Sequence, residues 1–221
     1  MKTLKTTIAA GLLVATGAAS AVELSGNVAL TSEYIWRGFS QSSGVPAIQG
    51  GFDLGYESGA YLGVWGSNVD DSIYGSELEF DVYGGWAGDI AEGLGLDVGF
   101  IHYQYPTAGS GTNFTELYVG LSFGPASLTQ YVGVDLGSED IGDSDFGNYT
   151  DLSLDLGEAA GIAFGAHVGF YDLDGGDDYY DYKLAGSKNL MGVDVELALT
   201  GTDDDASAAD ETVLLTFSKS L

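Results

Sequence analysis

The chain has 221 residues, with 33 acidic and six basic side chains, a formal net charge of −27 and no cysteine. This charge argues against nucleic acid or anionic lipid headgroups as electrostatic partners, and the lack of cysteine excludes a disulfide scaffold, a thiolate metal site and a Cys nucleophile. A hydrophobic content of 45% is too high for a disordered acidic tail, and the length suits one all-β domain.

The first 21 residues have the composition of a secretory signal peptide. Lys2 and Lys5 give a positive start, an apolar run covers residues 8–18, and Ala19-Ser20-Ala21 forms an A-x-A cleavage pattern. The apolar run is too short for a membrane-spanning helix, which needs about 20 residues. We therefore expect cleavage after Ala21 and a mature domain of residues 22–221.

The mature chain alternates between apolar and polar residues with a period of two. Around residue 80, for example, Leu78, Phe80 and Val82 alternate with Glu79 and Asp81, and only a strand separates these two sets onto opposite faces. The pattern predicts twelve strands near residues 24–37, 48–57, 61–67, 77–86, 94–100, 116–123, 128–136, 151–156, 162–170, 180–184, 193–199 and 213–221.

The predicted connections alternate between short and long. They are short around residues 57–59, 124–126 and 157–161, and longer and polar around 38–45, 67–76, 106–113, 137–146, 172–178 and 201–210. Outer-membrane barrels have this asymmetry between their two ends. The sequence therefore predicts an all-β, antiparallel, up-and-down transmembrane β-barrel of about twelve strands in the cell outer membrane.

Alternation alone leaves open which face of the strands is inside. A soluble barrel or a sandwich of two sheets would turn the apolar face inward, and it remains the alternative. A ring of twelve strands, however, is wider than side chains can fill. Aromatic residues also gather at strand ends, as in interfacial girdles, and Lys188 and Lys219 on the apolar face lie where they can reach a membrane rim. These features favour apolar side chains facing lipid.

Four segments carry a family resemblance. They are Ser32–Gln41, Pro46–Gly51, Gly59–Asn68 and Glu77–Gly85. Over roughly residues 25–85 the sequence resembles the TorF-type porin family of Gram-negative outer-membrane proteins, although it ends in Leu221 where many relatives end in Phe. The resemblance implies an outer-membrane barrel with a channel role, and it supplies no established substrate.

With the apolar face outward, the other face lines a water-filled interior rich in acids. The predicted lining residues are Glu33, Arg37, Asp53, Tyr61, Trp65, Glu77, Glu79, Asp81, Asp97, Glu116, Asp135, Asp151, Asp155, Asp181, Lys183, Asp194 and Glu196. An acidic bore concentrates cations and excludes small anions. The sequence thus predicts passive passage of small, preferentially cationic or polar solutes. The alternative is a structural or interaction barrel with a plugged interior and acidic extracellular loops.

A few interior residues carry more specific expectations. Arg37 is expected near the outer end of the first strand, where it would pair with carboxylates on neighbouring strands. It could brace residues 38–45 over the mouth of the barrel. The alternative is an ordinary ion pair in the interior. Glu77, Glu79 and Asp81 form a ladder that could share a divalent cation, but such carboxylates are more often paired or hydrated. Tyr61 and Trp65 either narrow the bore or only pack there.

The sequence contains little that indicates a metal site, a cofactor or catalysis. Residues 172–178 match a calcium loop only in part, and residues 139–145 and 203–205 match less. His102 on the outer face and His167 on the inner face have no serine nearby in sequence, although the fold could still assemble a triad. We expect no enzyme activity, no cofactor and no resident metal. The expected partners are outer-membrane lipids, lipopolysaccharide, small cations and divalent cations at the acidic loops, but no nucleic acid.

Overall fold

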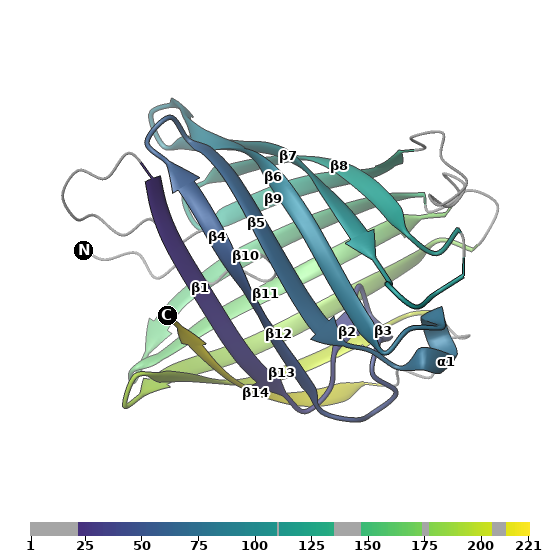
Figure 1. Ribbon diagram of the computed structural model, residues 1–221. Coiled ribbons are helices and arrows are strands. Elements are labelled where there is room, and N and C mark those ends of the chain that lie inside the picture. The colour runs from purple at the N-terminus through teal and green to yellow at the C-terminus, as the bar shows by residue number, and fades with distance from the viewer. Residues whose placement is uncertain (1–21, 110, 135–146, 174–176, 205–210) are drawn as a thin grey trace.

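The protein is a closed antiparallel barrel. The computed structural model describes residues 22–109, 111–134, 147–173, 177–204 and 211–221, so the expected signal peptide lies outside the described residues. Strands adjacent in sequence pair with one another, and β1 closes the ring against β14 (Figure 1). The barrel strands are β1 (Val22–Thr31), β4 (Ala47–Tyr56), β5 (Ala60–Asn68), β6 (Leu78–Ala91), β7 (Leu94–Gln104), β8 (Phe114–Phe123), β9 (Ala126–Val134), β10 (Asn148–Ala159), β11 (Ile162–Asp172), β12 (Tyr179–Leu190), β13 (Val193–Thr202) and β14 (Thr212–Ser220).

The two ends of the barrel differ, as the sequence predicts. One end, called here the short-turn end, has turns at residues 57–59, 92–93, 124–125, 160–161 and 191–192, and it also holds the start of β1 and the end of β14. The tight turns use positive φ angles, for example 54° at Ala160 and 74° at Gly161, because such turns match the twist of the flanking strands. The opposite, loop end carries the longer connections and the short helix α1 (Asp71–Tyr74) (Figure 1).

The barrel is apolar outside and polar inside. Leu24, Ile48 and Val213 are more than 60% exposed on the outer wall. Glu79, Glu116 and Asp181, by contrast, are at most 2% exposed. A water-soluble protein arranges its side chains the other way round, because burying apolar area is its main source of stability. The prediction of a transmembrane barrel with an outward apolar face is therefore confirmed, and the soluble alternative is wrong.

The predicted first strand is too long. β1 ends at Thr31, and residues 32–46 form a separate element that contains the paired short strands β2 (Ile35–Trp36) and β3 (Phe39–Ser40). Alternation continues through Trp36, so the pattern cannot reveal where the chain leaves the wall. Within the described residues no helix is long and apolar enough to cross a membrane.

Candidate functional site

Residues 32–46, called here the lumen hairpin, turn into the barrel, with Ser32 and residues 43–46 exposed at its base. The segment leaves the wall at Thr31 and returns at Ala47, two residues that pair directly across β1 and β4. Between these points its side chains reach strands all round the ring, which is possible only from the interior. The wall residues that they contact are Trp65, Glu79, Tyr103, Phe114, Glu116, Tyr131, Tyr149, Tyr171, Tyr179, Ala198 and Leu214.

Gly38 sets how closely the hairpin approaches the far wall. Its φ is +85°, and a Cβ at this position would lie 2.9 Å from the Cβ atoms of both Asp181 and Thr202. A side chain would therefore meet an unfavourable backbone conformation and two wall residues at once. Glycine at this position allows the tip of the hairpin to pack directly against β12 and β13.

Arg37, at the tip of the hairpin, is clamped by a carboxylate. Its two terminal nitrogens donate to the two carboxylate oxygens of Glu116 on β8, at 2.6 and 2.7 Å. Tyr103 also donates to Glu116, at 3.0 Å. Burial, the largest single cause, lowers the pKa of Arg37, but the charge of Glu116, its hydrogen bonds and the neighbouring Tyr103 and Tyr171 together outweigh burial and raise the pKa well above the usual value. A bidentate guanidinium–carboxylate pair of this kind is strong and directional.

Aromatic rings enclose the same guanidinium. The Arg37 Cζ atom lies 4.3 Å from the ring centre of Trp36 and 4.2 Å from that of Tyr149, with Tyr131 and Tyr171 slightly farther away. Each ring face attracts a cation, more strongly in the absence of water. The expectation that Arg37 lies on the first strand is wrong, and its carboxylate partner Glu116 is on β8 and not on a strand next to β1. The residue crosses the interior, because the chain turns inward after Thr31.

Two carboxylates beneath the hairpin have no base as partner among the described residues. Glu79 on β6 accepts hydrogen bonds from the hydroxyl groups of Tyr34, at 3.0 Å, and Tyr105, at 3.3 Å. Asp81, two residues on, is 4% exposed, and its Oδ1 atom accepts no hydrogen bond from the described residues. Burial, together with the charges of Glu79 and Asp81, raises the pKa of Tyr34, so its hydroxyl stays a proton donor.

The loop between β5 and β6 buttresses the hairpin from outside. The backbone N–H of Asp70 donates to the carbonyl of Gln41 at 2.8 Å, and Tyr74 donates to the Gln41 side chain. Asp70 also caps α1 by accepting from the hydroxyl and the N–H of Ser72, and these hydrogen bonds lower the pKa of Asp70. The hairpin is thus tied to one external loop as well as to the wall.

On the opposite wall, His167 on β11 lies between two carboxylates. Its Nδ1 atom is 2.9 Å from Asp151 and its Nε2 atom 2.8 Å from Asp181. Ser153 is directly across the sheet from His167, but its hydroxyl donates to Asp151 at 2.7 Å. Because both ring nitrogens face carboxylates, neither is placed to take a proton from the serine. The described residues around His167 therefore form a charge cluster and not a Ser–His–Asp triad.

The short-turn half of the interior has a looser arrangement of acids and tyrosines. Asp53 accepts from Tyr83 at 2.5 Å, and Asp97 accepts from Tyr61 at 2.6 Å. An ion pair on β12 and β13 joins Lys183 to Glu196 at 2.6 Å. Apart from Tyr83, which is buried, these side chains are only partly buried. This half of the bore therefore presents carboxylates whose main partners are neutral hydroxyl groups.

The remaining predicted lining residues are scattered. Glu33 lies in the lumen hairpin, where it accepts from Ser40 and from the Gly44 N–H. Glu77 is exposed ahead of β6, and Asp155 and Asp194 are exposed near the short-turn end. Asp135 lies outside the described residues, as do residues 139–145 and parts of the acidic segments 172–178 and 203–205. No group of three or more potential ligands able to hold a metal occurs among the residues that are described.

The sequence reasoning missed several interior tyrosines. Tyr103, Tyr131, Tyr149 and Tyr171 surround the hairpin and are buried or half-buried. Each shares strand parity with a residue that was expected to face inward, such as Asp97 for Tyr103 and Asp151 for Tyr149. Their positions in the alternating pattern could have identified them as inward-facing. Tyrosine is also typical of the outer aromatic girdle, however, so the residue type alone did not indicate which face of the strand it occupies.

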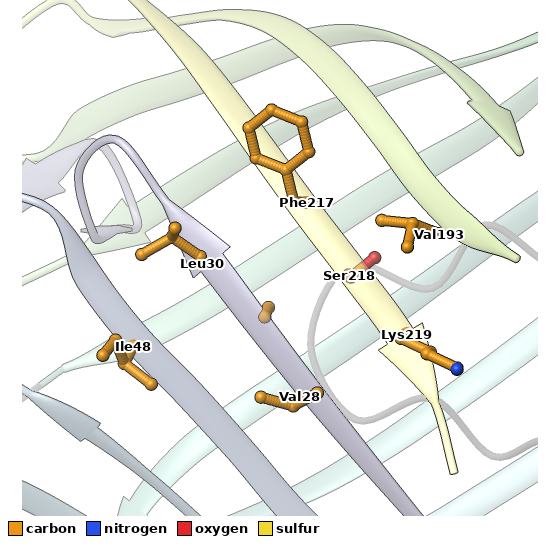
Figure 2. Close-up of a pocket in the computed structure, with 8 residues that line it drawn as sticks. Val28, Leu30, Ile48, Val193, Phe217, Ser218 and Lys219 are labelled. Atoms are coloured by element: carbon orange, nitrogen blue, oxygen red, sulfur yellow. The ribbon is translucent and has the colours of Figure 1, made fainter. Parts of the chain in front are cut away.

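A shallow hollow on the outer wall contrasts with this polar interior. It lies over β1, β4, β13 and β14, where Figure 2 shows Leu30, Ile48, Phe217 and Val193 around it with Lys219 at its edge. The hollow is almost wholly apolar. It belongs to the outward apolar surface, and no acidic residue lines it.

Comparison with known proteins places the chain in a family. Residues 15–220 match the family model described as "Bacterial protein of unknown function (Gcw_chp)". The chain belongs to this family. No protein with a curated description matches it in sequence. None of these findings carries the TorF name, so that resemblance remains a prediction.

Two solved porins share the fold of this Gcw_chp family member. A KdgM porin in complex with disordered oligogalacturonate has a TM-score of 0.54 at 6% identity, over 89% of this chain and 95% of that one. A NanC porin has a TM-score of 0.52 at 10% identity, over 89% of this chain and 98% of that one. At such low identity the likeness establishes the fold alone.

Proposed function

We propose that this protein is a porin-like channel of the Gram-negative outer membrane that passes small polar solutes and prefers cations. The observation that carries the proposal is the charge of the interior. Arg37 and Lys183 each pair with one carboxylate, Glu116 and Glu196 respectively. Within the part of the chain that the structure describes, Asp53 and Asp97 have only tyrosine hydroxyl groups as side-chain partners. Carboxylates without a base hold a negative field in a bore with low-dielectric walls, and such a field concentrates cations.

The outer wall and the shared fold support the membrane part of this proposal. The exposed apolar side chains would contact acyl chains, and lipopolysaccharide would surround the loop end, where acidic loops could bind divalent cations. The TorF-type resemblance is consistent with this location. The protein would act by passive passage of solutes through the bore. An anionic oligosaccharide such as oligogalacturonate, however, would be repelled by the carboxylates of this interior.

Planar-bilayer recording in a salt gradient tests the proposal. We expect a reversal potential of the sign that marks cation preference. The variants Asp53→Asn and Asp97→Asn should move the permeability ratio toward unity, whereas the matched control Glu57→Gln, in an exposed turn of the short-turn end, should leave it unchanged. Anion selectivity would contradict the proposal, and so would a folded protein that remains silent even without its lumen hairpin.

A second candidate function is a plugged structural or interaction barrel. The observation that favours it is the hairpin, whose contacts extend round the ring from Trp65 to Leu214. Replacing residues 34–43 with a short Gly-Ser linker separates the two possibilities. A permanent plug predicts a silent natural protein and a conducting variant, whereas a channel predicts conduction by both, with the larger conductance in the variant.

A further inference from the structure

We propose that the lumen hairpin is a movable gate that seats when Asp81 takes up a proton, so that acidification closes the passage. This inference rests on the proposed channel function. It follows from three features of the hairpin: its attachment to the wall, its backbone strain, and the unbalanced charge buried beneath it.

The attachment allows the hairpin to move as a unit. Both of its ends join the wall at one place, the Thr31–Ala47 pair, and β2 and β3 pair only with each other. Their ladder is separate from that of the barrel. Residues 33–45 could therefore swing out of the interior while the strand pairs of the barrel stay intact. Only side-chain contacts and a few loop hydrogen bonds, such as that from Asp70 to Gln41, would be lost.

The seated backbone is strained. Arg37 and Ser43, two residues that are not glycine, have φ angles of 48° and 51°. Such left-handed conformations persist only where surrounding contacts hold them, and they are common in segments that switch. The Arg37–Glu116 clamp and the aromatic rings around it hold the seated form. Leaving the interior would release the strain at Arg37.

The charge beneath the hairpin also opposes seating. Asp81 is buried, and its Oδ1 atom lacks a hydrogen bond from the described residues. It lies opposite Trp65 on β5 and Tyr103 on β7 in the cross-strand register. The other ionisable groups that interact with it are Glu79 and Tyr83 of β6, Glu116 of β8, Tyr34 of the hairpin, and Tyr74 and Tyr105 of the neighbouring loops.

These groups are acids or neutral donors, and the nearby base, Arg37, already has both terminal nitrogens on Glu116. An ionised carboxylate buried without a partner is costly, whereas a protonated one is not. Water reaches Asp81 when the hairpin leaves, and the charged form is then favoured. Seating and proton uptake are consequently linked, and lower pH favours the seated form by up to about tenfold per pH unit for one proton.

Conductance measured against pH tests the gate. Natural protein should lose conductance on mild acidification. Asp81→Asn, whose amide carries no charge at any pH, should have low conductance throughout and no acid step. The matched control Asp97→Asn removes an interior carboxylate that lies opposite Ala87, six residues along β6 from Asp81, and should keep the step. His167→Gln should also keep it, because His167 lies between Asp151 and Asp181 on the opposite wall. An acid step that survives Asp81→Asn would overturn the proposal.

Thiol labelling gives a second readout that needs no conduction. The chain contains no cysteine, so a single Ser42→Cys reports on the hairpin alone. Ser42 is fully buried, whereas Ser43 beside it is exposed. The ratio of the maleimide labelling rates of Ser42→Cys and Ser43→Cys removes the intrinsic pH dependence of the thiol. This ratio should fall several-fold on acidification, and it should be low and constant when Asp81→Asn is added. Heat-modifiable gel mobility verifies that each variant is folded.

The two readouts separate failure of the gate from failure of the channel. A constant labelling ratio with pH-independent conductance would overturn the gate and leave the channel standing. A labelling ratio that falls with pH, in a protein that never conducts even without residues 34–43, would support the moving hairpin and overturn the channel.

Discussion

The two halves of the barrel interior accommodate their charged side chains differently. At the loop end, Arg37 is enclosed by rings and paired with Glu116, while Asp81 is buried without a base. In the short-turn half, Asp53 and Asp97 are only partly buried and are bonded to tyrosines. The same alternation of strands builds both halves. The difference comes from the lumen hairpin, which excludes water from one half and not from the other.

The largest effect on the position of the lumen hairpin is expected from breaking the Arg37–Glu116 clamp at the loop end. Glu116→Gln leaves the buried guanidinium of Arg37 without its counter-charge, a change that typically costs about 3–5 kcal/mol. The hairpin should unseat, which raises conductance and speeds labelling of Ser42→Cys. Glu196→Gln is the matched control in the other half. Its ion pair with Lys183 is more exposed, so we expect a much smaller change. Equal effects of the two substitutions would mean that the ion pairs of the two halves contribute equally to the seating of the hairpin.

A smaller effect is expected from Gly38→Ala, which alters how the hairpin fits the far wall. The added methyl group would meet Asp181 and Thr202 as well as an unfavourable φ, and strain of this kind is worth about 1–3 kcal/mol. Gly44→Ala is the control, since its φ is also positive at +78° but nothing lies within 4 Å of its Cβ position. The labelling rate of Ser42→Cys should rise more for Gly38→Ala than for Gly44→Ala. The reverse order of labelling rates would contradict the packing of Gly38 against Asp181 and Thr202.

The short-turn half is tested by a substitution that changes charge but not volume. Asp97→Asn removes a carboxylate that accepts from Tyr61 and is expected to reduce cation preference while the hairpin stays seated. The measurements are the reversal potential and the labelling ratio in the same variant. If the labelling ratio changed as well, the two halves would be coupled and not independent.

The smallest effect on the permeability ratio is expected from a rise in salt concentration. At an ionic strength of 0.15 M, screening acts over about 8 Å. The partly hydrated carboxylates Asp53 and Asp97 should therefore lose influence as salt rises, and the permeability ratio should approach unity. The clamp between Arg37 and Glu116 is shielded from water, so the labelling ratio should change little over the same range. A labelling ratio that follows salt as steeply as the permeability ratio would indicate that the clamp is solvated.

Much of the wall could be read from the sequence. The period of two along residues 78–82 places Glu79 and Asp81 inward and Leu78, Phe80 and Val82 outward, and this is their arrangement in β6. The same parity places Asp53, Asp97 and Asp181 inside. The alternation of short and long connections also distinguished the two ends correctly. Strand geometry alone controls these features, because successive side chains must point to opposite faces.

The candidate site could be read only in part. Arg37 was recognised as an unusual interior base, but its partner Glu116 lies 79 residues away in sequence on a strand across the interior. Residues 34–37 continue the strand pattern, so no local signal marks the point where β1 ends. The pairing of Asp151 and Asp181 through His167 likewise depends on strands that meet only once the sheet has formed.

The amino-acid sequence by itself determined a twelve-stranded wall with apolar side chains outside and carboxylates inside, because strand periodicity is a local property of the chain. Only the tertiary structure decided that residues 32–46 turn into the interior. That choice depends on the closed ring, which brings Glu116, Tyr149 and Asp181 from separate strands around one segment. Such a set of contacts has no counterpart in local sequence.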